Sequence, residues 1–314
     1  SILSAARRAV RLDESPVLGP TATGKTNLAV SLAQVLSSEI ISADSRQIYK
    51  GMNIGTGKDL DEYNVNGNMI PYHLIDIINP IQDYSVYSFQ KAFHKVYNDI
   101  LDKQKLPILC GGTGLYIESV LLNYQMSDIK PNKRLRKDLE MLSKDELLTI
   151  FRDIDLEASK NWKTDTKQRI IRGIEIASSN DLDKSSKSTG HVLDLSKVIV
   201  LGVKTDREKV RKRITNRLEQ RLDNGMVEEV KQLLRDDLVS FERLNYFGLE
   251  YKHIGQYLNN QISFDEMFSK LNTAIHKFAK KQMTFFRRME KRGVNIQWVE
   301  NGDLQQALDI INLS

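Results

Sequence analysis

One short loop near the start of the sequence has the residue types and spacing that bind phosphate. It consists of Gly19, Pro20, Thr21, Ala22, Thr23, Gly24, Lys25 and Thr26, and it matches G-x-x-x-x-G-K-[ST] at every position. The glycines allow backbone N–H groups to turn inward around phosphate oxygens, and the helix expected after Gly24 points its positive end at the same place. Lys25 adds a positive charge, and the Thr26 hydroxyl is suited to hold Mg²⁺. The loop therefore predicts phosphate binding.

A carboxylate follows the next apolar stretch of the chain. Asp44 comes directly after Glu39–Ala43, which is expected to be a strand. In an open parallel sheet, ligands bind at the carboxyl ends of the strands, so Asp44 is expected near the phosphate loop. It could serve there as a general base or as a magnesium ligand. The structural alternative is that Asp44 caps the N-terminus of a following helix.

The elements that would position these residues alternate between strands and helices. The expected strands are Val17–Leu18, Glu39–Ala43, Tyr72–Ile78, Leu106–Cys110 and Val198–Val203, and the expected helices between them include Lys25–Leu36 and Val86–Leu101. This alternation is typical of an α/β fold, in which helices cover both faces of a parallel sheet.

The middle of the chain differs from this pattern. Residues 128–179 are helical in character, charged and poor in strand formers, and Ser178–Gly190 has the composition of an exposed loop. We therefore expect a core domain made of residues 1–127 and 195–314, with residues 128–194 as a helical insert. The C-terminal third is expected to be helical.

Basic residues are concentrated in three segments, although the net charge is only +5. Lys130–Lys137 has five basic residues in eight, Lys204–Arg221 has eight against three acidic ones, and Lys277–Arg292 has seven against one. Each segment alone is compatible with a solvated helix face, but three of them beside a phosphate loop favour a polyanionic partner. No apolar run is long enough to span a membrane, and the single cysteine excludes an internal disulfide, so we expect a cytoplasmic protein.

The residues after the most apolar strand argue against nucleotide hydrolysis. Enzymes that hydrolyse nucleoside triphosphates usually carry an acidic residue at the end of a core strand, where it helps to hold Mg²⁺. Here Pro107–Cys110 runs into Gly111-Gly112-Thr113-Gly114. A small-molecule kinase therefore stays only as an alternative.

Six stretches of the sequence form a more specific pattern than the phosphate loop alone. They are Gly19–Thr26, Ile40–Lys58, His73–Asp76, Gly111–Tyr116, Gln168–Arg172 and Ala279–Arg287. Together they resemble the signature of the tRNA dimethylallyltransferases, bacterial type, over nearly the whole chain. The chain departs from the family pattern at Gly248–His253, where a Gly-Tyr-Lys-Glu-like motif is usual, and at Asp59–Met69, which is longer and more polar.

The resemblance implies a P-loop NTPase-like fold with an inserted helical tRNA-binding domain. It implies transfer of a dimethylallyl group from dimethylallyl diphosphate to N6 of adenosine 37 in the tRNA anticodon stem-loop, with Mg²⁺ and release of diphosphate. Related enzymes that act on free AMP, ADP or ATP are the main alternative, but they usually lack much of the insert. We expect a monomer that does not associate with membranes.

The resemblance also implies a role for individual residues. Residues 19–26 would bind the diphosphate, with Thr21 in a catalytic role and Thr26 at the metal. Asp44 would take a proton from the adenine amine, and Arg213 or Arg217 would neutralise the leaving diphosphate. The residues implied in tRNA binding are Asp44, Ser45, Arg46, Gln47, Thr113, Gln168, Arg169, Ile170, Ile171 and Arg172.

Overall fold

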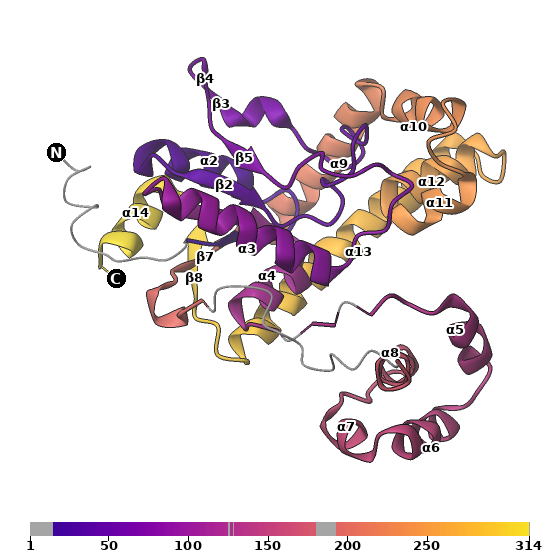
Figure 1. Ribbon diagram of the computed structural model, residues 1–314. Coiled ribbons are helices and arrows are strands. Elements are labelled where there is room, and N and C mark those ends of the chain that lie inside the picture. The colour runs from indigo at the N-terminus through magenta and orange to yellow at the C-terminus, as the bar shows by residue number, and fades with distance from the viewer. Residues whose placement is uncertain (1–14, 125, 128, 180–192, 314) are drawn as a thin grey trace. The chain divides into compact units, whose positions relative to one another are not determined.

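The computed structural model describes residues 15–124, 126–127, 129–179 and 193–313 (Figure 1). Most of the predicted loop Ser178–Gly190 lies outside these ranges. Clustering of contacts divides the chain into two compact units, residues 1–124 with 190–314, and residues 125–189. Each unit is described below by itself.

A six-stranded parallel sheet forms the centre of the larger unit. Its strand order is β5-β2-β6-β1-β7-β8. The strands are β1 (Val17–Leu18), β2 (Glu39–Ser42), β5 (Tyr72–His73), β6 (Pro107–Gly111), β7 (Val200–Lys204) and β8 (Ile296–Glu300). All five pairs of neighbouring strands are parallel, which confirms the predicted α/β architecture.

The strand before the phosphate loop is short, but it is paired with a neighbouring strand on both sides. Val17 pairs with Cys110 of β6 and with Leu201 of β7. Backbone bonds extend this pairing by two residues, from Ser15 N–H to the Pro107 carbonyl at 3.3 Å and from Leu201 N–H to the Pro16 carbonyl at 2.8 Å. A central position in the sheet thus gives a two-residue strand enough partners to fix the loop that follows it.

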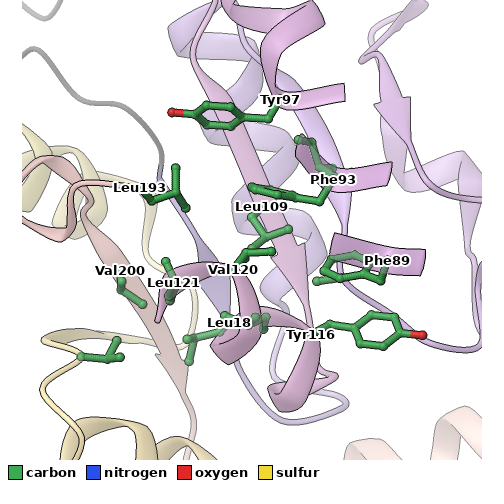
Figure 2. Close-up of a cluster of buried hydrophobic side chains, with 14 of the residues drawn as sticks. Leu18, Phe89, Phe93, Tyr97, Leu109, Tyr116, Val120, Leu121, Leu193 and Val200 are labelled. Carbon is green, nitrogen blue, oxygen red and sulfur yellow. The ribbon is translucent and has the colours of Figure 1, made fainter. Parts of the chain in front are cut away.

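Helices cover both faces of the sheet, and successive residues of each strand alternate between the two faces. Val17 belongs to a core with α2 (Lys25–Leu36) and α14 (Leu304–Leu313). Leu18 faces the opposite core, where α3 (Val86–Asp102), α4 (Gly114–Leu121) and the end of α13 (Phe264–Glu290) pack. Figure 2 shows Leu18 and Leu109 of the sheet with the aromatic side chains of α3. Each fully buried Leu or Phe of this kind contributes about 1.5–3 kcal/mol to folding.

The C-terminal helices form a third core beside the sheet. They are α9 (Arg207–Asp223), α10 (Met226–Arg235), α11 (Phe241–Phe247) and α12 (Leu249–Leu258), with the first half of α13. Tyr251, Met267 and Leu271 are almost fully buried there. Ile48, Tyr49 and Met52 join the same core, so the loop after β2 is anchored against these helices.

Two predictions about the strands are wrong. The C-terminal third is not all helical, because β8 completes the sheet beside β7. Val294-Asn295-Ile296-Gln297-Trp298-Val299 has the alternation of a half-buried edge strand, a signal overlooked between two helical segments. The strand expected at Tyr72–Ile78 is only two residues long, since Leu74 and Asp76 have positive φ and end the extended backbone.

The polar segment after residue 58 forms a small projection from the sheet unit. It consists of a 3₁₀ turn, η1 (Leu60–Tyr63), and the hairpin β3 (Asn64–Val65) and β4 (Asn68–Met69). Asn66 and Gly67 both have positive φ, as a tight two-residue hairpin turn requires. Tyr63 packs against Tyr72 with ring centroids 4.9 Å apart, which fixes the turn to the sheet.

The smaller unit is helical. It contains α5 (Lys133–Glu140), α6 (Lys144–Ile154), α7 (Leu156–Asn161) and α8 (Lys167–Ala177), and a further 3₁₀ turn, η2 (Leu195–Lys197), precedes β7 in the larger unit. Phe151, Ile170 and Ile174 form its core, and a capping box at Ser143 starts α6. No helix within the described ranges is long and apolar enough to cross a membrane.

Candidate active site

The phosphate loop connects the central strand β1 to the N-terminus of α2. Gly24 caps this helix with φ 91°, and Ala22 has φ 63°, so the loop needs left-handed backbone at two points. The Thr23 hydroxyl donates to the Pro20 carbonyl at 2.9 Å and closes the turn. Thr26 lies in the first turn of α2, and its hydroxyl has no hydrogen-bond partner within the described residues. The loop thus offers helix N–H groups and a hydroxyl to an anion and its metal ion.

The charge of Lys25 is destabilised by its surroundings. Burial lowers the pKa of Lys25 below its ordinary value, and Cys110 and Asp44 oppose this only in part. A phosphate placed beside the ammonium would offset that cost. Cys110 lies under the loop, with Sγ 3.9 Å from the Lys25 carbonyl, and burial raises the pKa of its thiol to about 12. Cys110 therefore remains a protonated packing residue.

Asp44 lies at the carboxyl end of β2 and uses one oxygen to shape the chain. Its Oδ1 accepts hydrogen bonds from the backbone N–H of Arg46 at 2.8 Å and of Gln47 at 3.4 Å. The following residues form turns, so the helix N-cap alternative is wrong. Its Oδ2 accepts no hydrogen bond from the described part of the chain, which leaves a carboxylate oxygen available to a ligand.

Thr113 lies next to the residues that follow Asp44. The N–H of Ser45 donates to Thr113 Oγ1 at 3.0 Å, and that hydroxyl lies 3.3 Å from Ser45 Oγ. Thr113 N–H in turn donates to the Ala43 carbonyl at 3.2 Å. The ends of β2 and β6 are thereby joined, and Asp44, Ser45 and Thr113 lie together.

Arg46 and Gln47 have different surroundings. The guanidinium of Arg46 lies 5.6 Å from the ring centre of Tyr246, a partly exposed residue of α11. Gln47 accepts from Ser42 Oγ at 3.1 Å and donates to the Gly57 carbonyl at 2.9 Å. The oxygen and the nitrogen of its side-chain amide are therefore both bonded to the protein itself, between the end of β2 and Gly57.

Gln282 of α13 joins the phosphate loop to the turn after β6. Its Oε1 accepts from Thr21 N–H at 2.9 Å, and its Nε2 donates to the Gly112 carbonyl at 2.9 Å. Gln282 was not predicted as a site residue, although a glutamine on the buried face of an amphipathic helix is a recognisable signal. Gln282 therefore fixes the spacing between the phosphate loop and the turn after β6.

Only one of the two candidate arginines, Arg213 and Arg217, lines a pocket beside the phosphate loop. It is lined by Thr21, Ala22, Ile214, Arg217, Leu218, Arg221, Met226, Glu250 and Ile275. Arg217 belongs to it, whereas Arg213 is exposed on another part of α9 and does not line it. Burial, together with the charge of the neighbouring Arg221, lowers the pKa of Arg217 to about 10, which is still high enough for the side chain to be a cation at neutral pH.

Arg221 and Glu250 also line the pocket, and neither was predicted from the sequence. Arg221 packs against Gly57, whose φ is +62°, and a Cβ at Gly57 would lie 1.7 Å from Arg221 Nη2. Glu250 lies in the segment that departs from the usual family motif, and burial raises its pKa. The departure of Gly248–His253 from the family motif was the one feature of the sequence that could have pointed to Glu250 as a site residue.

The predicted RNA residues of α8 divide into exposed and buried side chains. Gln168 and Arg169 are exposed, and Arg169 pairs with Asp165 at 2.6 Å. Arg172 donates to the Ile129 carbonyl at 2.6 Å. Ile170 and Ile171 have exposed fractions of 0% and 4%, so their side chains support the core and offer no surface to RNA.

The fold and site define an α/β protein with a P-loop motif at the carboxyl ends of a parallel sheet, where ligands bind in such folds. The family model "IPP transferase" matches residues 47–289, and the model "Isopentenyl transferase" matches residues 15–69. The chain belongs to the IPP transferase family, which comprises the tRNA dimethylallyltransferases.

Individual relatives match over nearly their full length. The chain is 49% identical to tRNA dimethylallyltransferase 1 of Azobacteroides pseudotrichonymphae over 94% of this chain and 95% of the relative. The tRNA isopentenylpyrophosphate transferase of Bacillus halodurans matches with a TM-score of 0.67 and 28% identity, over 95% of this chain and 94% of that one. The tRNA delta(2)-isopentenylpyrophosphate transferase of Staphylococcus epidermidis matches with a TM-score of 0.65 and 31% identity, over 96% of this chain and 98% of that one. These matches confirm the resemblance and the P-loop NTPase-like fold.

Proposed function

We propose that this chain transfers a dimethylallyl group from dimethylallyl diphosphate to N6 of adenosine 37 in tRNA. The observation that carries the proposal is that the phosphate loop, Asp44 and Thr113 lie together at the carboxyl ends of neighbouring strands. The chain that carries them is 49% identical to a tRNA dimethylallyltransferase. The adenine nitrogen forms a bond to the allylic carbon, the bond from that carbon to the diphosphate oxygen breaks, and the nitrogen loses a proton.

The diphosphate side of the reaction is assigned to the phosphate loop and α9. Residues 19–26 bind the diphosphate through backbone N–H groups and Lys25, and Arg217 faces the same pocket. Negative charge increases on the departing group, so fixed positive charges lower the barrier. Arg213 is given no part in this step because it does not line the pocket.

The loop is also suited to Mg²⁺. Thr26 supplies a hydroxyl without a partner in the described residues, and Mg²⁺ typically takes one or two protein oxygens together with phosphate oxygens and water. No cluster of three or more His, Cys, Asp or Glu side chains in the described ranges could bind a metal on its own. When bound, Mg²⁺ would neutralise diphosphate charge, with Thr26 as its protein ligand.

The acceptor side is assigned to the residues after β2. Asp44 accepts the proton of the adenine amine through Oδ2, since Oδ1 is held by two backbone N–H groups. Thr113 and Ser45 lie beside it, and Arg46 adds a cation near Tyr246. Because adenosine 37 starts stacked in the anticodon loop, the base has to leave its stack before it reaches Asp44.

The helical unit favours tRNA as acceptor over free adenylates. Residues 125–189 form a compact body of their own with exposed Gln168 and Arg169 on α8, which a free nucleotide would not need. We assign anticodon-loop binding to Gln168, Arg169 and Arg172. We further propose that the protein acts as a monomer in the cytoplasm, where its tRNA substrate is found.

The first experiment is a transfer assay with three acceptors. The protein is incubated with Mg²⁺, labelled dimethylallyl diphosphate and either unmodified tRNA, AMP or no acceptor, and the nucleosides are analysed. Label on adenosine 37 of tRNA is the expected result. Label only on AMP would replace the proposal by adenylate prenylation, and phosphate transfer from labelled ATP without either product would favour a kinase.

A further inference from the structure

Two arginines, not one, face the phosphate loop from α9. Arg217 and Arg221 are four residues apart, so they lie on the same side of the helix. Both line the pocket that also includes Thr21 and Ala22 of the phosphate loop. Their side chains are only 33% and 16% exposed. An anion in this pocket would therefore meet two guanidinium groups that are largely shielded from water.

A carboxylate of the protein already holds both arginines. Asp59 Oδ2 accepts a hydrogen bond from Arg217 Nη2 and lies 3.4 Å from Arg221 Nη2. Asp59 precedes η1, but its side chain makes no hydrogen bond to that helix's backbone. The Asp59 carboxylate therefore binds the two arginines and does not cap the local turn. It offers them an anionic oxygen, as a phosphate group would.

The two guanidinium groups are poorly solvated in the pocket. Burial lowers the pKa of both Arg217 and Arg221, which means that their charged forms lack the solvation they would have in water. Glu250 also lines the pocket, but it makes no ion pair within the described part of the chain. A multiply charged anion would satisfy both guanidinium groups better than the single charge of Asp59.

We propose that Arg221 is a second arginine of the diphosphate site and that Asp59 is a built-in competitor for it. In the enzyme without donor, Asp59 holds Arg217 and Arg221; when the donor binds, its diphosphate displaces the carboxylate. After transfer, Asp59 recaptures the arginines and helps the diphosphate product to leave. The inference rests on the proposed function only for the identity of the donor, since the phosphate loop alone predicts an anion in this place.

The competing role for Asp59 is positioning. A carboxylate that merely holds Arg217 in the orientation needed by the diphosphate would also pair with it in the free enzyme. The two roles predict opposite effects when the carboxylate is removed. A competitor weakens anion binding, so its loss tightens binding, whereas a positioning residue strengthens it, so its loss weakens binding.

The test is the affinity for inorganic diphosphate with Mg²⁺, measured by calorimetry on the full chain without tRNA. Asp59→Asn is expected to bind diphosphate roughly five- to tenfold more tightly, and Arg221→Gln to bind it more weakly by a similar factor. Asp61→Asn is the matched control, because Asp61 is an exposed carboxylate two residues away and its loss changes the net charge equally. The control should stay within about twofold of the parent.

Weaker binding in Asp59→Asn, or a change no larger than in Asp61→Asn, would overturn the competitor role. Unchanged binding in Arg221→Gln would remove Arg221 from the diphosphate site. Asp59→Ser repeats the test with a smaller side chain should the Asn variant fold poorly. In the transfer assay, Asp59→Asn should lower KM for the donor and increase inhibition by diphosphate. Because binding is measured without acceptor, a failed transfer assay would contradict the proposed function and leave this inference standing.

Discussion

At the scale of single residues, the two carboxylate oxygens of Asp44 have different surroundings. Oδ1 is committed to the backbone turn through Arg46 and Gln47, and Oδ2 faces no donor in the described part of the chain. A substitution that keeps the first function and removes the second can therefore separate chemistry from folding. Asparagine does so, since its amide oxygen can still accept the backbone N–H groups.

Asp44→Asn is expected to lower kcat by roughly 10²–10⁴, the usual contribution of a general base, with tRNA affinity and Tm close to the parent values. Single-turnover transfer and tRNA binding would be measured side by side. Asp44→Ala, which also loses the turn, should show the same rate loss together with a lower Tm. Full activity in the Asn variant would exclude Asp44 as the proton acceptor.

Gln282 is a second residue whose contribution can be isolated. Removing its amide in Gln282→Ala leaves the Thr21 N–H and the Gly112 carbonyl without their partner, at a cost of about 1–3 kcal/mol for the buried groups. We expect a lower Tm and a higher KM for the donor, because the phosphate loop loses its link to α13.

The control for Gln282 is Gln305→Ala, which removes an exposed glutamine of α14 whose side chain, among the described residues, bonds only to Asp309. Its Tm and KM should be near those of the parent. If Gln282→Ala lowered Tm while the KM for the donor stayed constant, Gln282 would be a packing residue without influence on the site.

At the scale of elements, the buried carboxylate of Glu39 links the first residue of β2 to β5 and to the segment between α3 and β6. Glu39 is hydrogen-bonded to His73 of β5 at 2.8 Å, to Lys103 after α3 at 3.1 Å and to Lys105 before β6 at 2.8 Å. Burial alone raises the pKa of Glu39, but the hydrogen bonds from Lys105, His73 and Lys103 outweigh burial and lower the pKa to about 2.

Because the folded pKa of Glu39 lies below the ordinary value of 4.5, its stabilisation is complete above pH 4.5 and is lost as the pH falls toward 2. Glu39→Gln should therefore lower the free energy of unfolding by about 2 kcal/mol at pH 7, after allowance for the exposed lysines, and by much less near pH 3. Urea unfolding of the parent and the variant at pH 7 and at pH 3 would measure the change in the free energy of unfolding. Glu219→Gln, an exposed change on α9, is the control; a loss that did not depend on pH would contradict the linkage.

Local patterns predicted the elements that carry the site. The helix after the phosphate loop has the predicted bounds Lys25–Leu36, because apolar spacing and Gly24 both act within a few residues. β8 has a local strand signal that was overlooked, but its place in the sheet depends on pairing with β7, almost a hundred residues earlier, which no local pattern shows. Sequence periodicity records which face of an element is apolar, but not which distant strand supplies its hydrogen bonds.

The same limit explains the missed site residues. The phosphate loop and Asp44 were found because a contiguous motif and a strand end identify them. Gln282 meets Thr21 across 261 positions, and Arg221 meets Asp59 across 162. No local spacing relates such residues, so only the packing of α9 and α13 beside the sheet brings them to the phosphate loop.

At the scale of the whole molecule, the basic residues differ in whether their charges are used within the protein. In Lys277–Arg292, Arg288 and Arg292 pair with the buried Glu118, so part of that charge is structural. In the helical unit, Arg172 is bonded to the Ile129 carbonyl and to Glu175. Arg169 is 44% exposed and pairs only with the exposed Asp165 within the described residues, which makes it the better probe of RNA binding.

Arg169→Gln is expected to weaken tRNA binding and to reduce the slope of log Kd against log salt by slightly less than one, as one lost phosphate contact predicts. The rate at saturating tRNA should not change, because the diphosphate site lies in the other unit. Lys231→Gln removes an exposed, ion-paired cation from α10 and controls for net charge. A salt slope that fell equally in both variants would indicate long-range attraction by the whole protein, and a slope unchanged in Arg169→Gln would mean that RNA contacts a different surface.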